Sequence, residues 1–151
     1  MITVLEYEGV LLKLNKPMEK IHIKHPKRSQ EFSTGAYSDA VQVGNFFFVS
    51  GQAAVDFESS NFILGTIEEE THRTLGNIKS IIEAAGGTME NIVKCTVHLS
   101  DIDDFNKYNT VYSTYFNGVK PARTTVQSVL AEGIKIEIDA IAILTINSTP
   151  C

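Results

Sequence analysis

The stretch IKIEIDAIAIL, residues 134–144, decides the fold expected for this chain. It alternates as a β-strand, yet apolar residues occur on both of its sides. One side carries Ile136, Ile138, Ala140 and Ala142, and the other carries Glu137, Asp139, Ile141 and Ile143. A single layer of helices covers only one of these sides. We therefore expect part of the second side to pack against another subunit.

Two helices are predicted from apolar spacing and end signals. The first covers residues 66–85, with Glu68, Glu69 and Glu70 at its start and a Gly-Gly pair at 86–87 after its end. The second follows Asp101 and Asp104 and runs to Phe116.

Further strands are predicted over residues 21–24, 40–43, 46–50, 91–100 and 121–130. A Gly-Asn pair at 44–45 closes a hairpin, and residues 56–61 are expected to form a polar loop. Strand 91–100 is expected to place Val93, Cys95, Val97 and Leu99 on one face. This order predicts an α+β fold, a mixed sheet with two helices packed on one face.

Length and composition favour one globular domain. The 151 residues are 43% hydrophobic and 21% charged, and the formal net charge is -5. Apart from residues 24–28, no Lys/Arg cluster is present, which disfavours nucleic acid as a partner. Cys95 and Cys151 are expected to be a buried thiol and a stray terminal one, as in a reducing cytosol. The chain has no signal sequence or membrane span, which predicts a cytoplasmic protein.

Arg123 and Glu137 are the most informative polar residues, because each lies in a strand that otherwise looks buried. An arginine beside hydroxyls offers a planar fork of donors for a small carboxylate. A glutamate in an apolar strand suits acid–base chemistry near neutral pH. Together they suggest one pocket that binds a small acid and moves protons on it. The plainer alternatives are an ion pair between Arg123 and Glu137 or Asp139, and an edge-strand glutamate.

The spacing of the two strands qualifies this pairing. If residues 121–130 and 134–144 form a hairpin that turns near 131–133, Arg123 faces a residue well beyond Glu137. Water or substrate would then fit between the two side chains.

Four other residues are candidates for lining a cleft. Tyr37 lies in a loop before the first hairpin, Ser50 and Gly51 end an apolar strand, and Asn109 lies on the second helix. Gly51 would let a ligand approach the backbone closely. Their plainer interpretations are a core or surface tyrosine, an ordinary turn and a solvent-facing amide.

Metal and nucleotide motifs are absent from the sequence. His22 and His25 lack the helical setting and third ligand of a zinc site. His72 is expected on the exposed side of the first helix, and only His98 is retained as a residue near a site. Cys95 is interpreted as a core thiol, and no phosphate loop, dinucleotide glycine signature or nucleophile elbow occurs.

Several segments in this order resemble the reactive-intermediate deaminase family, also called the RidA, YjgF or L-PSP endoribonuclease family. The segments that carry the resemblance include GAYSDA (35–40), FVSGQ (48–52), IVKCTV (92–97), NTVY (109–112), PARTTV (121–126) and KIEIDAIA (135–142). The resemblance implies a chorismate-mutase-like fold that assembles as a homotrimer with clefts between subunits. It implies a single domain over residues 21–151, preceded by an N-terminal extension over 1–20.

The resemblance also implies an activity, which is the hydrolysis of 2-imino acids such as 2-iminopropanoate to 2-keto acids and ammonia, without metal or organic cofactor. Arg123 would hold the substrate carboxylate with help from the backbone near Gly51, and Glu137 would activate water and relay protons. Tyr37, Ser50 and Asn109 would line the cleft, Asn109 from a neighbouring chain.

Two departures from the family pattern affect specificity. Thr125 stands where many deaminases have cysteine, although its backbone would still serve in substrate binding, and the loop 130–134 is one residue shorter than usual. The rival functions are a non-catalytic carboxylate-binding regulator and an endoribonuclease or translation inhibitor.

Overall fold

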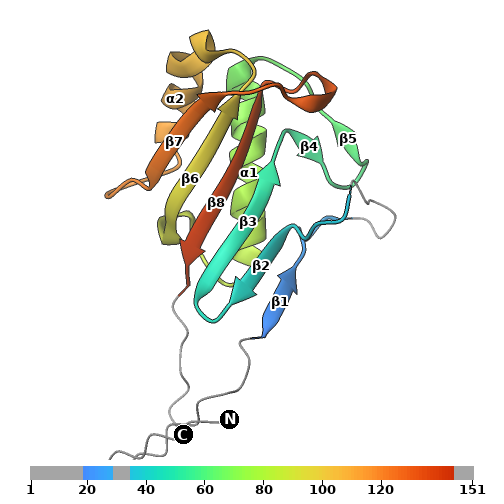
Figure 1. Ribbon diagram of the computed structural model, residues 1–151, viewed down its shortest axis with the longest axis vertical. Coiled ribbons are helices and arrows are strands. Elements are labelled where there is room, and N and C mark those ends of the chain that lie inside the picture. The colour runs from blue at the N-terminus through green and yellow to red at the C-terminus, as the bar shows by residue number, and fades with distance from the viewer. Residues whose placement is uncertain (1–18, 29–34, 145–151) are drawn as a thin grey trace, which may run out of the picture.

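The computed structural model describes residues 19–28 and 35–144 (Figure 1). Its main sheet is built from β1 (Lys20–Ile23), β2 (Ala40–Val43), β3 (Phe46–Gln52), β6 (Ile92–Leu99), β7 (Ala122–Gln127) and β8 (Ile136–Ile143). A small separate sheet contains β4 (Val55–Asp56) and β5 (Asn61–Phe62). The helices are α1 (Ile67–Ala84) and α2 (Phe105–Ser113), with 3-10 turns η1 (Met89–Asn91), η2 (Ile102–Asp104) and η3 (Ala131–Gly133).

The main sheet has the strand order β1-β2-β3-β8-β6-β7. Only the β6–β7 pair is parallel, and α1 and α2 pack together on one face (Figure 1). This arrangement confirms the predicted mixed sheet with one helical layer. Of the expected N-terminal extension, residues 1–18 lie outside the described ranges, and β1 begins at Lys20.

The hairpin considered for the last two strands does not form, because β6 lies between them. Ser128 N–H donates to the Leu99 carbonyl at 2.8 Å, and Ser100 N–H donates to the Lys135 carbonyl at 3.0 Å. The end of β6 is thus hydrogen-bonded to the segments that precede and follow the η3 turn. The β6–α2–β7 crossover makes β6 and β7 parallel, as is usual when a helix connects two strands of one sheet.

Local chemistry explains the boundaries of α1. The Thr66 side chain accepts a hydrogen bond from Glu69 N–H, and the Glu69 carboxylate accepts one from Thr66 N–H. This reciprocal capping box starts the helix beside three acidic residues that favour its N-terminal end. The helix ends at Ala84, and Gly86 takes a φ of 81°, which favours glycine.

Two local predictions need correction. Val93 is 43% exposed rather than on the buried face, because an irregularity between Ile92 and Lys94 shifts the strand register and buries Ile92 instead. The second helix ends at Ser113, short of Phe116, although Phe116 is still buried. The loop predicted over 56–61 is confirmed over residues 57–60, which form the turn between β4 and β5.

The two sides of β8 have different environments. Ile136, Ile138, Ala140 and Ala142 form part of the core under the helices, as predicted. The side without helices, here called the open face, carries Ile141 and Ile143, which pair in register with Phe48 and Phe46 of β3. Phe46 is 49% and Phe48 is 44% exposed. Such a contiguous apolar surface is typical of an interface, so burial of this face by another subunit stays our expectation.

Within the described ranges, neither helix is long and apolar enough to cross a membrane.

Candidate functional site

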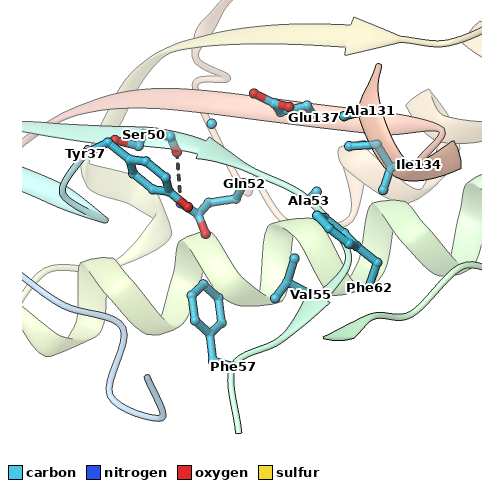
Figure 2. Close-up of a pocket in the computed structure, with 11 residues that line it drawn as sticks. Tyr37, Ser50, Gln52, Ala53, Val55, Phe57, Phe62, Ala131, Ile134 and Glu137 are labelled. Atoms are coloured by element: carbon cyan, nitrogen blue, oxygen red, sulfur yellow. Dashed lines mark hydrogen bonds between the residues drawn. The ribbon is translucent and has the colours of Figure 1, made fainter. Parts of the chain in front are cut away.

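The candidate residues lie in two separate cavities. The β3 cavity, of about 470 Å³, is lined by Tyr37, Ser50, Gly51, Gln52, Ala53, Val55, Phe57, Phe62, Ala131, Ile134 and Glu137 (Figure 2). The α2 cavity, of about 220 Å³, is lined by Asn109, Tyr112, Ser113, Lys120, Pro121 and Arg123. Sequence reasoning therefore found residues of both cavities but assigned them to one pocket.

Glu137 lies on the open face of β8, beside the end of β3. Its carboxylate packs against the α-carbon of Gly51, because a Cβ added at Gly51 would overlap Oε1 and stand 2.9 Å from Cδ. No ion pair or hydrogen bond to this carboxylate occurs within the described residues. The glycine at position 51 thus makes room for Glu137, and the carboxylate keeps its acceptor sites for water or a ligand.

The β3 strand end fixes the polar side of this cavity. Ser50 donates its hydroxyl hydrogen to the Ser38 carbonyl at 2.6 Å, and Gln52 donates to the Ser50 carbonyl at 3.0 Å (Figure 2). The Ser50 hydroxyl therefore retains its acceptor lone pairs for a ligand. The Tyr37 ring is half exposed at the rim.

Arg123 lies on the other side of the sheet, under α2. Its guanidinium carbon is 4.6 Å from the ring centroid of Tyr112 and 5.3 Å from that of Tyr108, while Nη1 donates to Asn109 Oδ1 at 2.8 Å. Cation–π contacts and one hydrogen bond hold the guanidinium in place and leave its other donors for an anion. Thr125 supports this cluster, because its hydroxyl lies 2.6 Å from the Tyr108 phenol oxygen.

The structure does not bring Arg123 and Glu137 together within one chain. Arg123 pairs in register with Cys95, which belongs to the buried helical face, whereas Glu137 pairs with His98 on the open face. The two side chains consequently lie on opposite faces with β6 between their strands. Among the described residues Arg123 forms no ion pair with Glu137 or Asp139, so the structural ion-pair alternative is also wrong.

The other ionisable side chains considered in the sequence are a cysteine and two histidines. Burial raises the pKa of the Cys95 thiol, which agrees with the prediction of a core thiol. Burial also raises the pKa of the Tyr112 phenol. His98 Nδ1 lies 2.8 Å from the Ser128 hydroxyl oxygen, and His72 is exposed on α1 as predicted. In the part of the chain that the structure describes, no three His, Cys, Asp or Glu residues cluster so that they could hold a metal ion.

Sequence reasoning missed a buried cluster behind the β3 cavity. Asp39 is 2% exposed and accepts hydrogen bonds from Arg28 Nε at 2.6 Å and from His25 N–H at 2.8 Å. The His25 ring stacks on Phe57 at 4.0 Å, and the Arg28 guanidinium lies 4.9 Å from the same ring. The basic residues 24–28 were visible in the sequence, but nothing in it showed that they fold against Asp39 and Phe57.

Comparisons with a family model, with known sequences and with solved structures all find relatives over most of the chain. Residues 28–144 match the model of a family described as Endoribonuclease L-PSP. A RutC family protein from Pyrococcus abyssi is 49% identical over 109 residues, which cover 72% of this chain and 86% of the relative. The 2-iminobutanoate/2-iminopropanoate deaminase of Rattus norvegicus is 46% identical over 110 residues, covering 72% of this chain and 80% of that protein. The crystal structure of E. coli TdcF with bound serine superimposes with a TM-score of 0.75 at 31% identity, over 83% of this chain and 99% of TdcF.

Proposed function

The chain belongs to the Endoribonuclease L-PSP family, which includes the RidA and YjgF proteins, and from this premise we propose that it hydrolyses 2-imino acids to 2-keto acids and ammonia. 2-Iminopropanoate is the simplest such substrate. The rat relative carries the name of a deaminase of 2-iminobutanoate and 2-iminopropanoate, which supports this reaction class. The serine bound in the TdcF structure is a small α-amino acid, comparable in size to 2-iminopropanoate.

The proposed active site lies between two copies of the chain in a homotrimer. One copy would contribute Glu137, Gly51, Ser50 and Tyr37, and its neighbour would contribute Arg123, Asn109 and Thr125. Two facts support this arrangement: the two halves lie on opposite faces of one sheet, and the open face presents a contiguous apolar surface. A cyclic assembly repeats the same contact and so completes every site with a neighbour's residues.

The neighbour's Arg123 would bind the substrate carboxylate. A guanidinium and a carboxylate form two parallel N–H···O bonds, which fix both the position and the plane of the anion. Asn109 occupies one donor of this guanidinium at 2.8 Å and thereby restricts its rotation. The substrate would thus arrive in one orientation, which is a large part of catalysis when the reaction itself is simple addition.

Glu137 would act as the proton carrier. It takes a proton from an attacking water as the water oxygen bonds to the imine carbon, and it delivers this proton to the imine nitrogen. In the second step it moves the hydroxyl proton to the amino group, the C–N bond breaks, ammonia leaves and the keto group forms. The imine carbon is already electrophilic, so positioning and proton transfer by these side chains suffice and the reaction needs no cofactor.

The observation that carries this proposal is the Glu137 carboxylate, which lies against Gly51 at a cavity and has no partner among the described residues. A site that only bound a carboxylate would not need an unpaired acid there, because a second negative charge opposes anion binding. This argues for an enzyme over the non-catalytic binding protein.

The reaction can be tested with 2-aminoacrylate, generated in situ from serine by a dehydratase, while pyruvate release is followed. The wild-type protein should accelerate pyruvate release, and Arg123→Ala should lose most of this effect at moderate substrate. Arg73→Ala removes an exposed arginine of α1 and is the matched control. Equal pyruvate release with and without the wild-type protein would reject the deaminase for this substrate.

Subunit complementation tests where the site lies. Arg123→Ala and Glu137→Ala proteins should each be inactive alone. After the two are co-refolded, about one cleft in four should combine an intact Glu137 from one chain with an intact Arg123 from the other. Activity near a quarter of wild type supports a shared site, and no recovery despite mixed trimers contradicts it.

The endoribonuclease activity and the cytoplasmic location are tested independently of the deaminase. Net charge of -5 and the absence of a basic, aromatic stripe in the sequence disfavour RNA binding. Incubation with single-stranded RNA decides the point, since cleavage that persists in Glu137→Ala would come from another source than this site. The cytoplasmic location stays a prediction, testable by fractionation.

A further inference from the structure

We propose that the β3 cavity selects 2-imino acids with a large apolar side chain, branched or aromatic, over 2-iminopropanoate. This inference rests on the deaminase proposed above and assigns its substrate class. It arises from the division of the cavity lining into a polar part and an apolar part, and from the fixed position of the apolar part.

The polar part contains Glu137 and the end of β3, where the reaction would occur. The apolar wall is defined here as Val55, Phe57, Phe62, Ala131 and Ile134, which line the cavity together with Tyr37 and Ala53. Figure 2 draws Val55, Phe57 and Phe62 on the β4–β5 side and Ala131 with Ile134 at the η3 turn. The apolar wall offers neither a charge nor a hydrogen-bonding side chain, so it suits a hydrocarbon substituent.

The size of the cavity exceeds what the smallest substrate needs. It measures about 470 Å³, within the range of sites for medium-sized organic ligands. The substituent of 2-iminopropanoate is one methyl group, which is about as large as a water molecule, roughly 30 Å³. Such a substrate would leave most of the apolar wall in contact with water, whereas an isobutyl or benzyl group would cover it.

The β4–β5 side of the apolar wall is preformed. The Asn77 side-chain amide of α1 donates to the Ala53 carbonyl at 3.0 Å and to the Val55 carbonyl at 2.9 Å. Phe57 is stacked on His25 at 4.0 Å. These contacts connect the wall to the helix layer and to the buried cluster, so that little ordering is required when a substituent binds.

The η3 side is shaped by an unusual backbone. Glu132 has a φ of 54° and Gly133 a φ of 74°, both in the left-handed region. A Cβ at Gly133 would stand 3.5 Å from Leu64 Cδ1, so the turn packs against the segment that follows β5. This turn brings the small side chain of Ala131 and the buried side chain of Ile134 to the cavity. A larger residue at 131 would therefore reduce the space.

The geometry of the proposed site directs the substituent to this wall. The carboxylate of a 2-imino acid would face the neighbour's Arg123, and its imine carbon would lie at Glu137. The third group on that carbon then points away from both charged residues. Each methylene group that moves from water to an apolar site favours binding about fourfold. The leucine-derived imine has three more carbons than the alanine-derived imine, so we expect a preference of at least tenfold and about 60-fold at full burial.

The test compares imines under one flux. D-Amino acid oxidase with catalase converts D-alanine, D-leucine and D-phenylalanine to the corresponding 2-imino acids, which have no stereocentre at the reacting carbon. Semicarbazide traps free imine, and a deaminase lowers the initial rate of semicarbazone formation. The concentration of protein that halves this rate should be at least tenfold lower for the leucine- and phenylalanine-derived imines than for the alanine-derived imine.

Two variants examine the wall itself. Ala131→Phe should fill the cavity and abolish the preference for the leucine- and phenylalanine-derived imines. Val129→Phe is the matched control, since Val129 is fully exposed and does not line the β3 cavity. Phe62→Ser, at a partly exposed position, should weaken the preference without enlarging a buried core. Circular dichroism and the trimer mass establish that each variant is folded.

The outcomes separate this inference from the function on which it rests. If all imines are consumed and the alanine-derived one is favoured or equal, the selectivity is refuted and the deaminase stands. If no imine is consumed, the deaminase is refuted. Calorimetric titration with 4-methyl-2-oxopentanoate and with pyruvate then tests whether the cavity prefers the longer side chain. Binding of the longer acid at least tenfold tighter, lost in Ala131→Phe, supports the apolar site, and equal or absent binding overturns it.

Discussion

Replacing Gly51 by alanine should displace the Glu137 carboxylate while the fold stays intact. The added Cβ would overlap Oε1 and stand 2.9 Å from Cδ, whereas ordinary contacts begin near 3.4 Å. The carboxyl carbon must therefore move by at least 0.5 Å, which is 3.4 minus 2.9, and its oxygen by more. Since a displacement of about 1 Å can reduce catalysis about 10²-fold, we expect a loss of that order in kcat.

Stability should change little in this variant. The backbone of Gly51 does not lie in the left-handed region, so alanine can adopt it, and the atoms that clash belong to the mobile end of a side chain. Gly76→Ala is the matched control: it lies within α1, and a Cβ there has no neighbour within 4 Å. This control should gain about 0.5–1 kcal/mol in unfolding free energy with unchanged activity.

The assay is the imine-trapping measurement, run with Gly51→Ala, Glu137→Ala and the double variant. If the alanine acts by moving Glu137, the double variant should be no less active than Glu137→Ala alone. A further loss in the double variant would show that Gly51 acts on its own, through its backbone. Wild-type activity in folded Gly51→Ala would refute the role given to the position of Glu137.

Three further predictions concern stability and assembly. Burial lowers the pKa of His25, so below about pH 6.5 the unfolded chain binds more protons than the folded one. The melting temperature should therefore fall between pH 7 and pH 5, and it should fall less steeply in His25→Asn. Parallel curves of melting temperature against pH for the two proteins would contradict this. Glu70→Ala removes a fully buried acceptor of Lys135 N–H and should cost about 3 kcal/mol in denaturant titrations, with Glu70→Gln costing less; equal losses would contradict the role of the charge. Phe48→Glu on the open face should yield monomers by light scattering, while Val119→Glu, at a 95% exposed position, keeps the wild-type mass; an unchanged mass for both would exclude the open face as the interface.

Periodicity predicted the elements well because it depends on neighbouring residues only. Alternation in β8 assigned Ile136 and Ile138 to the core and Glu137 to the other side, and the structure agrees. A one-residue irregularity is invisible to this reasoning, which is why Val93 was placed on the wrong face. The acidic residues Glu68, Glu69 and Glu70 indicated the start of the first helix for the same local reason, and α1 begins at Ile67.

Strand order, by contrast, depends on contacts between distant segments. The short connection from β7 to β8 suggested a hairpin, but Ser100 and Ser128 show that β6 occupies the space between them. The same limit applies to the buried cluster. Neither the charge of Arg28 nor that of Asp39 reveals that the two meet behind Phe57, because no spacing rule pairs two residues of the long connection between β1 and β2.

The separation of Arg123 from Glu137 has a consequence for how activity depends on assembly. Side-chain rotation cannot join them, because a strand's alternate residues point to opposite faces and β6 stands between β7 and β8. If both residues serve one reaction, the chain is active only as an oligomer, and dilution below the assembly constant should abolish turnover without unfolding the subunit. Recognition of the acid would then belong to one chain and selection of its side chain to the other. Mutations on the apolar wall should consequently alter specificity through one chain alone, while the carboxylate site of the neighbour keeps its affinity.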